Sequence, residues 1–178
     1  MVIWVTGLSG AGKTTLCLEI LPRLKRRMAQ VVFLDGDAVR TVVQDDLGFT
    51  EADRVVQIGR IQRFARLLSE QGLVVLVAAL YTSKDLLAWN RATFNPYLEV
   101  LVDTPLNVVE ARDAKGIYAK ARAGVSQNVV GLDIPFHRPE APDYVCAPAT
   151  LEAAAVAAEA IVAMVLNRWR ETGPNVGA

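Results

Sequence analysis

Short apolar runs alternate with longer segments of helical periodicity along the chain. An apolar run with no polar interruption is typical of a parallel strand that is covered on both faces. The run at residues 2–6 is of this kind, and further strands are predicted at residues 31–34, 73–79 and 98–102, with a short strand at residues 144–145. Strands that alternate with helices predict an α/β protein with a five-stranded parallel sheet wrapped by helices.

The segments between these runs carry apolar residues at the spacing of a helix. Helices are predicted after Thr14 as far as Arg27, at residues 38–44, after Glu51 as far as Leu68, from about Lys84, at residues 106–113 and at residues 151–170. On the third helix, the stripe expected to pack on the sheet is Val55, Ile58, Ile61, Phe64, Ala65 and Leu68. Trp89 and Phe94 are expected in the core. Thr104 is expected to cap the fifth helix, with Pro105 at its first position.

The composition is that of a single folded domain spanning residues 1–178. Hydrophobic residues make up 52% of the chain and charged residues 21%, which excludes a disordered protein. Lys and Arg total 19 and so do Asp and Glu, so the chain has no global positive charge for binding nucleic acid. Residues 153–166 are apolar but contain Glu159, which favours a globular helix over a membrane span.

Two cysteines, Cys17 and Cys146, lie far apart in the sequence, and no signal peptide is expected because the second residue already begins a predicted strand. This use of cysteine predicts a reduced, cytoplasmic location, with Cys17 packed as a small buried thiol. The sequence leaves the oligomeric state open, with a homodimer among the possibilities.

The sequence GLSGAGKT at residues 7–14, called the phosphate loop below, matches the pattern G-x-x-x-x-G-K-[ST]. It lies between a predicted strand and a predicted helix, where backbone N–H groups and the helix dipole point at one anion. Lys13 can reach the β- and γ-phosphates of a nucleotide, and the Thr14 hydroxyl can ligate Mg²⁺. A glycine-rich turn without a ligand is the alternative, which the complete pattern in this context disfavours.

Asp35 and Asp37 follow the second predicted strand, at the sheet edge where open parallel sheets bind ligands. One carboxylate can join the coordination of a metal, and the other can face an acceptor hydroxyl. The alternative for Asp37 is to cap the helix that follows, and the two roles are compatible. Beside a phosphate loop, the pair predicts a catalytic site.

Several cations are predicted to face the same cleft. Arg40 follows Asp37 by three residues and therefore shares its helical face. Arg54 lies at the positive end of the third helix, where a cation indicates an anionic ligand; a solvated surface arginine is the alternative. Residues 114–140, called the lid below, begin with a basic, glycine-bounded segment that is expected to close over phosphates. An ordinary solvated helix face is the alternative for that segment.

Motifs across nearly the whole chain resemble those of the adenylyl-sulfate kinases, which use MgATP to phosphorylate the ribose 3′-hydroxyl of adenosine 5′-phosphosulfate. The matching segments are, in family order, residues 7–15, 35–40, 47–54, 102–105, 110–118, 120–124 and 131–133. The Asp-Gly-Asp segment at 35–37 and the Arg-Asp-Ala-Lys-Gly segment at 112–116 are the most specific. The resemblance implies a three-layer α/β/α P-loop kinase fold with a basic lid, and a role in sulfate assimilation.

The resemblance also implies a role for each matching residue. ATP would be bound by Gly7, Leu8, Ser9, Gly10, Ala11, Gly12, Lys13, Thr14, Thr15 and Arg112, and Mg²⁺ by Thr14 and Asp35. The acceptor nucleotide would be bound by Asp37, Arg40, Phe49, Arg54, Gln57, Tyr81 and Lys115. Lys13, Asp35 and Asp37 would carry the catalysis of an in-line phosphoryl transfer.

The chain departs from the family pattern on the acceptor side. The departures are Tyr81 for serine, Gln57 for asparagine, Gly59 for arginine, Val129 for an aromatic residue and His137 for glutamate. They leave the phosphate loop unchanged, so the kinase chemistry is expected to be intact. The identity of the acceptor molecule is left undecided.

Three hypotheses for the function follow. The first acceptor is adenosine 5′-phosphosulfate. The second is another nucleotide with a substituted 5′-phosphate, such as cytidine diphosphoramidate, whose kinases are similar to this family. The third is a nucleotide-binding regulator without turnover, which the presence of Lys13, Thr14, Asp35 and Asp37 disfavours.

Overall fold

A computed structural model describes residues 1–43 and 46–172. The strands are β1 (Val2–Thr6), β2 (Val31–Asp35), β3 (Val74–Ala79), β4 (Tyr97–Val102) and β5 (Tyr144–Cys146). They form one parallel sheet in the order β2-β3-β1-β4-β5. Every residue of β1, β3 and β4 is buried, including the polar Thr6 of β1 and Glu99 of β4. The predicted five-stranded parallel sheet is confirmed.

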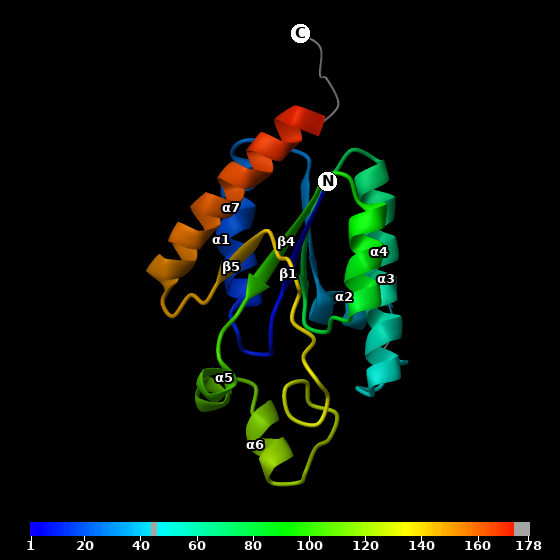
Figure 1. Cartoon of the computed structure of the whole chain (residues 1–178), viewed down its shortest axis with the longest axis vertical. Helices are drawn as coiled ribbons and strands as arrows, with labels where there is room; N and C mark the ends of the chain where they lie inside the picture. The colour runs from blue at the N-terminus through cyan, green and yellow to red at the C-terminus, as the bar shows by residue number, and fades with distance from the viewer. Residues whose placement is uncertain (44–45, 173–178) are drawn as a thin grey trace.

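The helices lie in two layers and at one edge of the sheet. They are α1 (Lys13–Lys25), α2 (Gly36–Val43), α3 (Glu51–Glu70), α4 (Lys84–Thr93), α5 (Leu106–Arg112), α6 (Ile117–Arg122) and α7 (Leu151–Thr172). Helices α1 and α7 cover one face of the sheet, and α3 and α4 cover the other (Figure 1). This arrangement is the predicted three-layer α/β/α fold. None of the described helices combines the length and apolar character needed to cross a bilayer.

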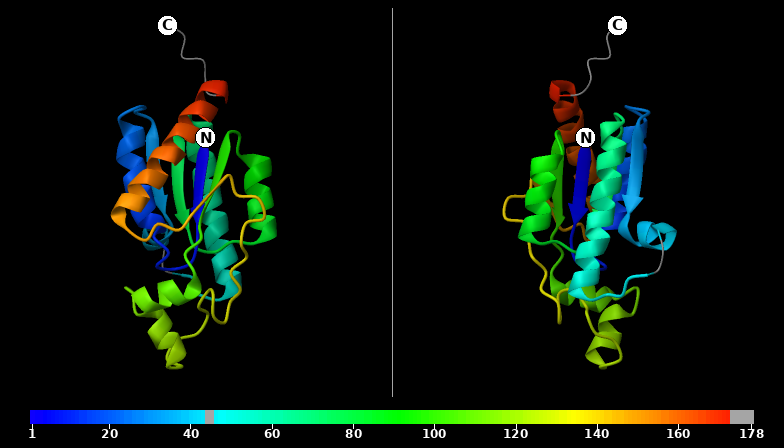
Figure 2. Two further views of the ribbon diagram at one scale, coloured as in Figure 1. Left: turned by 60° about the vertical axis from the view of Figure 1, so that its left-hand side comes forward. Right: turned by 90° about the vertical axis from the view of Figure 1, so that its right-hand side faces the viewer.

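Helices α5 and α6 lie beyond the carboxyl ends of the strands, at the lower end of the molecule in Figure 1. Figure 2 shows that this lower part is joined to the sheet by loops. The phosphate loop follows β1 and the segment Asp35–Asp37 follows β2, so both reach the same edge. Side chains from distant parts of the sequence therefore converge there, as the topology of a parallel sheet requires.

The face that α3 turns to the sheet differs in part from the predicted stripe. The buried residues of α3 are Gln57, Ile58, Ile61, Gln62 and Ala65. Val55 and Phe64, which were predicted to be buried, are 42% and 40% exposed. Two glutamines take buried positions beside the apolar residues, and apolar periodicity cannot identify such positions. The core prediction is also wrong for Trp89, which is 36% exposed and meets the buried Phe94 edge to face.

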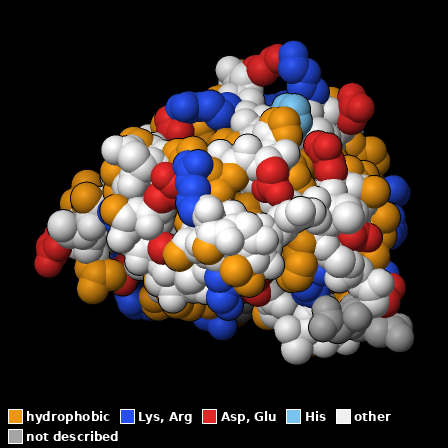
Figure 3. Space-filling model, turned by 90° about the horizontal axis from the view of Figure 1, so that it is seen from below, with side chains coloured by type: hydrophobic (Ala, Val, Ile, Leu, Met, Phe, Trp, Pro, Cys, Tyr) orange, Lys and Arg blue, Asp and Glu red, His pale blue; other side chains and the backbone are white. Residues whose placement is uncertain are grey.

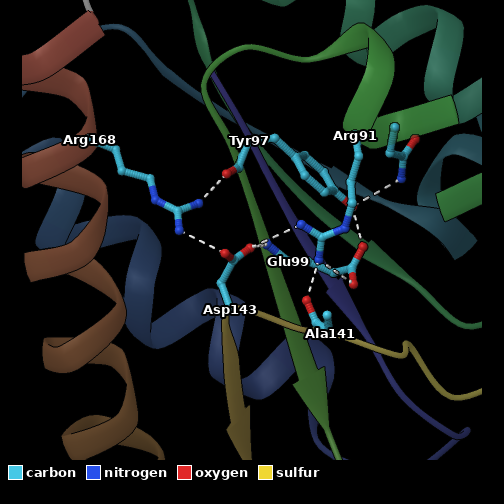
Figure 4. A network of polar contacts seen from close by, with 7 residues as sticks. Arg91, Tyr97, Glu99, Ala141, Asp143 and Arg168 are labelled. Atoms are coloured by element: carbon cyan, nitrogen blue, oxygen red, sulfur yellow. Dashed lines mark hydrogen bonds and ion pairs between the residues drawn. The ribbon is translucent and has the colours of Figure 1, made fainter. Parts of the chain in front are cut away.

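A polar network at the amino-terminal half of β4 fixes α4 and α7 to the sheet (Figure 4). Glu99 on β4 is buried, pairs with Arg91 of α4 at 2.9 Å and accepts a hydrogen bond from the Tyr97 hydroxyl at 3.0 Å. Asp143 accepts hydrogen bonds of 2.7 Å from the backbone N–H of Glu99 and from Arg168 of α7. Burial raises the pKa of Glu99 because it penalises the charged form, and the contacts with Tyr97 and Arg91 oppose this shift.

Candidate active site

A cleft of about 540 Å³ lies at the carboxyl edge of the sheet, between the phosphate loop, α2, α3 and the lid. It brings together most of the residues that the sequence predicts for the site. Those that line it are Ser9, Gly10, Gly12, Lys13, Thr14, Thr15, Asp35, Asp37, Arg40, Phe49, Arg54, Gln57, Tyr81 and Lys115. Gly7, Leu8 and Ala11 belong to the phosphate loop without lining the cleft. The structure does not bring Arg112 there: it lies exposed at the end of α5.

The phosphate loop needs its glycines for its shape. A Cβ atom on Gly7 would lie 2.4 Å from the carbonyl oxygen of Val102, so only glycine allows β1 to turn this close to β4. Gly10 and Gly12 have φ angles of +73° and +102°, in the left-handed region that favours glycine. Gly12 directly precedes α1, whose first N–H groups therefore face the cleft.

Lys13 is the cation of the phosphate loop. Its Nζ donates a hydrogen bond of 2.8 Å to the backbone carbonyl of Leu8, which holds the ammonium across the loop. Burial lowers the pKa of Lys13 to about 8, against the opposing effect of Asp37. A bound phosphate would raise this pKa again, because a nearby anion favours the protonated form.

Two side chains from outside the phosphate loop hold its backbone carbonyls. Thr104 donates from its buried Oγ1 to the carbonyl of Ala11 at 3.0 Å, and the Tyr118 hydroxyl of α6 donates to the carbonyl of Ser9 at 3.0 Å. The prediction that Thr104 caps the fifth helix is therefore wrong. Helix α5 begins at Leu106 and has no side-chain cap. Sequence reasoning missed the bracing role of both residues.

Thr14 and Asp35 form the oxygen pair to which the sequence assigns Mg²⁺. Thr14 Oγ1 donates a hydrogen bond of 2.8 Å to Asp35 Oδ2. Mg²⁺ usually takes one or two carboxylates and completes its shell with water and phosphate oxygens, so a hydroxyl and a carboxylate beside a phosphate loop fit this ion. In the described part of the chain, no group of three or more His, Cys, Asp or Glu side chains could hold a metal by itself.

Asp35 also begins α2. Its second oxygen, Oδ1, accepts hydrogen bonds from the backbone N–H groups of Asp37 at 3.0 Å and Ala38 at 3.4 Å. Helix α2 therefore begins at Gly36, two residues before the predicted start, and the cap is Asp35 where Asp37 was considered. The predicted end of this helix, Gln44, lies outside the described residues. With both oxygens engaged, Asp35 suits a metal-binding role better than a proton-accepting role.

The Asp37 carboxylate is directed toward the lid. Lys115 Nζ lies 2.5 Å from Asp37 Oδ2, and the two side chains are 61% and 79% exposed. A pair this exposed contributes little to stability and exchanges readily for other partners. Because Asp37 does not cap α2, its carboxylate is available to accept a proton from a hydroxyl group in the cleft.

The wall opposite the phosphate loop combines an aromatic ring with two arginines. Arg40 Cζ lies 4.8 Å and Arg54 Cζ 5.7 Å from the centroid of the Phe49 ring, which is 58% exposed. Arg54 also donates to the backbone carbonyls of Phe49 at 3.1 Å and Asn128 at 2.8 Å. Burial, followed by the repulsion of Arg40, lowers the pKa of Arg54 from its usual value. Two neighbouring cations favour an anionic ligand, and the exposed ring offers a stacking surface for a base.

The lid supplies the remaining wall of the cleft. Lys115 and Lys120 line the cleft, whereas Arg122 is exposed and pairs with Glu110 of α5 at 2.7 Å. Viewed from below, the lid end of the molecule carries acidic and basic side chains side by side (Figure 3). Its basic residues therefore divide between the cleft and the solvent. The Asp133 carboxylate accepts hydrogen bonds from the backbone N–H groups of residues 128 and 129 and shapes the inner loop of the lid.

A cluster that sequence reasoning missed closes the acceptor side. The Tyr81 hydroxyl donates a hydrogen bond of 2.6 Å to Glu51 Oε1, and His137 Nε2 lies 4.0 Å from the same oxygen. Burial, with the hydrogen bond to Glu51, raises the pKa of Tyr81 to about 12. The Thr82 hydroxyl donates to the His137 carbonyl and joins β3 to the end of the lid. In the sequence, Glu51 is recognisable only as an acidic residue in the first turn of a helix, and this position does not indicate a contact with Tyr81.

The comparison with protein families decides the identity, because the family model described as adenylylsulphate kinase matches residues 1–147. The chain belongs to the adenylyl-sulfate kinase family. An adenylyl-sulfate kinase from Synechococcus sp. is 43% identical over 146 residues, which cover 82% of this chain and 83% of the relative. An adenylyl-sulfate kinase from Bacteroides thetaiotaomicron is 41% identical over 144 residues, covering 80% of this chain and 72% of the relative.

A solved structure with a similar fold is that of the Mycobacterium tuberculosis APS kinase CysC in complex with AMPPNP and APS. It superposes with a TM-score of 0.83 at 35% sequence identity, over 93% of this chain and 96% of that chain. The fold expected from the resemblance to adenylyl-sulfate kinases, a P-loop kinase fold with a lid, is therefore confirmed.

Proposed function

We propose that this protein transfers the γ-phosphoryl group of ATP to the 3′-hydroxyl of adenosine 5′-phosphosulfate, with ADP as the second product. The observation that carries the proposal is a single cleft that joins the phosphate loop to Asp37, Arg40, Phe49 and Arg54 on the opposite wall. Family membership supports the same reaction, since the relatives carry the name of this activity. A structural neighbour was solved with an ATP analogue and APS bound.

The phosphate loop and α1 hold the donor. The N–H groups at the start of α1 bind the phosphates, and Lys13 exchanges its contact with the Leu8 carbonyl for the β- and γ-phosphates. Thr14 and Asp35 would hold Mg²⁺, which supplies positive charge to neutralise the phosphate oxygens during transfer. The loop contacts of Thr104 and Tyr118 keep the N–H groups aimed at one point.

The opposite wall holds the acceptor. The base stacks on the exposed Phe49 ring, and Arg40 and Arg54 hold the anionic 5′-phosphosulfate. The 3′-oxygen attacks the γ-phosphorus, the bond from that phosphorus to the β–γ bridging oxygen breaks, and the hydroxyl proton passes to the Asp37 carboxylate. Lys115, already in contact with Asp37, stays beside the transferred group as positive charge.

An acceptor panel tests this function. ADP formation is measured with saturating MgATP and either adenosine 5′-phosphosulfate or cytidine diphosphoramidate, against a reaction without acceptor. We expect turnover that depends on adenosine 5′-phosphosulfate. The cytidine nucleotide is included because the chain departs from the family pattern at Gln57, Tyr81 and Val129. Turnover with this nucleotide alone would instead assign the chain to kinases of other substituted nucleotides.

We also place the reaction in the cytoplasm, because Cys17 and Cys146 are both free thiols, as suits a reduced compartment.

For the assembly we propose a homodimer, which sedimentation equilibrium of the purified full chain tests directly. A monomer at micromolar concentration would contradict it.

A further inference from the structure

Asp133 holds the backbone of the lid at the point where the lid meets Arg54. Its carboxylate accepts hydrogen bonds from the backbone N–H groups of Asn128 and Val129. The carbonyl of Asn128 in turn accepts a hydrogen bond of 2.8 Å from Nη2 of Arg54. Asp133 and Arg54 are far apart in the sequence, but they contact the same short stretch of backbone.

One peptide group lies between these two side chains. The carbonyl of Asn128 and the N–H of Val129 belong to the same trans peptide, in which the two groups point in opposite directions. The N–H donates to Asp133, and the carbonyl accepts from Arg54. A carboxylate can only accept hydrogen bonds and a guanidinium can only donate them, so the two side chains fix this peptide in one orientation. A peptide turned the other way would direct its N–H at the cation, and Arg54 would lose this partner.

The loop around this peptide is closed by its own backbone. The carbonyl of Val129 accepts hydrogen bonds from the N–H groups of Leu132 at 3.1 Å and Ile134 at 3.2 Å. Asn128 has a φ angle of +66°, in the left-handed region that residues with a side chain seldom adopt. The two hydrogen bonds to the Asp133 carboxylate hold the N–H groups on both sides of this unusual residue. The shape of the segment that meets Arg54 therefore depends on Asp133.

The contact with the lid also sets how Arg54 can meet a ligand. Its Nε donates to the carbonyl of Phe49 at 3.1 Å, so this bond and the bond to Asn128 hold the planar guanidinium at two points. A guanidinium has five N–H donors, so three remain for an anion in the cleft that Arg54 lines. A cation that is already oriented loses less conformational entropy when its ligand binds.

We propose that Asp133 is a positioning residue for acceptor binding, which holds Arg54 through the peptide group between Asn128 and Val129 in the orientation that receives the anionic group of the acceptor. Asp133 itself does not line the cleft, so its effect reaches the acceptor through Arg54. The inference rests on the proposed function. It assigns part of the affinity for the acceptor to a carboxylate on the lid.

A double-mutant cycle tests this coupling. The kcat/KM for adenosine 5′-phosphosulfate is measured at saturating MgATP in the wild type, Asp133→Ala, Arg54→Ala and the double variant. We expect Asp133→Ala to lower this value by about fivefold to tenfold, with the KM for ATP within about twofold of the wild type. In the Arg54→Ala background the same change should matter by less than about twofold, because the residue through which Asp133 acts is missing.

Asp133→Asn is the conservative variant, and the cycle is repeated with it if Asp133→Ala does not fold. It keeps one accepting oxygen and the shape of the side chain, so it should retain more of the affinity for the acceptor than Asp133→Ala. A carboxylate with a merely structural role would lower both KM-related constants together and would show the same loss whether or not Arg54 is present.

Asp113→Ala is the matched control. Asp113 also holds two consecutive backbone N–H groups of the lid, those of Tyr118 at 3.2 Å and Ala119 at 2.8 Å, but these partners lie on α6. Its effect on kcat/KM should therefore be the same with and without Arg54.

Two results would overturn the inference while the proposed function stands. One is a loss in Asp133→Ala that persists in full in the Arg54→Ala background, and the other is an equal rise in the KM for ATP. A wild-type protein that binds ATP but does not turn over adenosine 5′-phosphosulfate overturns the proposed function, and the inference with it.

Discussion

The Tyr81 hydroxyl and Glu51 Oε1 are joined by a hydrogen bond of 2.6 Å that connects the end of β3 to the first turn of α3. The same turn carries Arg54, so this bond helps to set the position of the acceptor wall relative to the sheet. Tyr81 is 4% exposed, so this bond is made largely out of contact with solvent.

Removing this bond should weaken acceptor binding selectively. Tyr81→Phe keeps the ring and frees Glu51 to turn toward water, so we expect a loss of about 1 kcal/mol in the free energy of unfolding. We expect the KM for the acceptor to rise severalfold while the KM for ATP stays unchanged. Tyr144→Phe on β5 is the control for loss of a hydroxyl elsewhere. An equal rise in both KM values would contradict the assignment of Tyr81 to the acceptor wall.

The lowered pKa of Lys13 predicts a pH dependence. In the free protein this pKa is about 8, so kcat/KM for ATP should fall above that pH as the ammonium that binds phosphates is lost. Lys13→Arg keeps its charge and should move the fall to higher pH, even with lower activity. A profile that is flat from pH 7 to 10 would show that Lys13 does not contact the donor.

The same shift has a consequence for stability, with the opposite sign. Between about pH 8 and the ordinary lysine value of 10.5, the unfolded chain binds a proton at Lys13 that the folded chain has released. The contribution of Lys13 to the free energy of unfolding therefore rises with pH in this window. Comparing denaturant midpoints of the wild type and Lys13→Met at pH 7.5 and 9.5 measures this contribution.

Asp37 is expected to matter for the chemical step more than for folding. Asp37→Asn removes the carboxylate that we propose as the proton acceptor, so kcat should fall by about 10² to 10⁴, with little change in the melting temperature because the side chain is exposed. Glu19→Gln, a charge change on α1 outside the cleft, is the control. Retention of more than half of the wild-type kcat in Asp37→Asn would assign the proton transfer to another group.

Arg54 should act on the acceptor alone. Arg54→Ala removes the cation that we propose faces the 5′-substituent, and we expect a loss of at least about tenfold in kcat/KM for the acceptor, with ATP binding nearly unchanged. Arg63→Ala, an exposed arginine on the same helix, is the matched control and should be silent. Equal loss of ATP affinity would place Arg54 on the donor side.

Thr104 offers the complementary test on the donor side. Thr104→Val has nearly the same shape but leaves the Ala11 carbonyl of the phosphate loop without its donor, which should cost about 1–3 kcal/mol of stability. We expect a severalfold rise in the KM for ATP and an unchanged KM for the acceptor. Thr93→Val, at the end of α4, is the control variant. An unaffected KM for ATP would show that the loop keeps its shape without this bond.

The sequence was sufficient for the fold wherever an apolar pattern had one interpretation. The run Val2–Thr6 has no polar residue before Thr6 and became β1 with the predicted bounds. Helix α3 was harder, because Gln57 and Gln62 occupy its buried face while Phe64 is exposed. Hydrophobicity indicates the tendency of a residue to be buried, and the burial of a glutamine depends on hydrogen bonds that distant segments supply.

The site residues also divide into those that a local sequence pattern predicts and those that depend on distant contacts. The phosphate loop was identifiable because its pattern is local and every position in it serves one ligand. Thr104 and Glu51 act through partners 93 and 30 residues away, so their sequence neighbours suggested only helix caps and surface charge. Contacts of this range arise from the packing of the fold, which a single sequence without related sequences does not display.

The lid touches both halves of the cleft through one short segment. Lys115 meets Asp37 on the acceptor wall, and Tyr118 meets Ser9 in the phosphate loop. A nucleotide that breaks one of these two contacts therefore changes the position of the lid segment that the other nucleotide binds against. Thermodynamic reciprocity then requires donor and acceptor to alter each other's dissociation constants by the same factor. The coupling between the two substrates is thus a single free energy, and the segment from Lys115 to Tyr118, which contacts both halves of the cleft, would carry it.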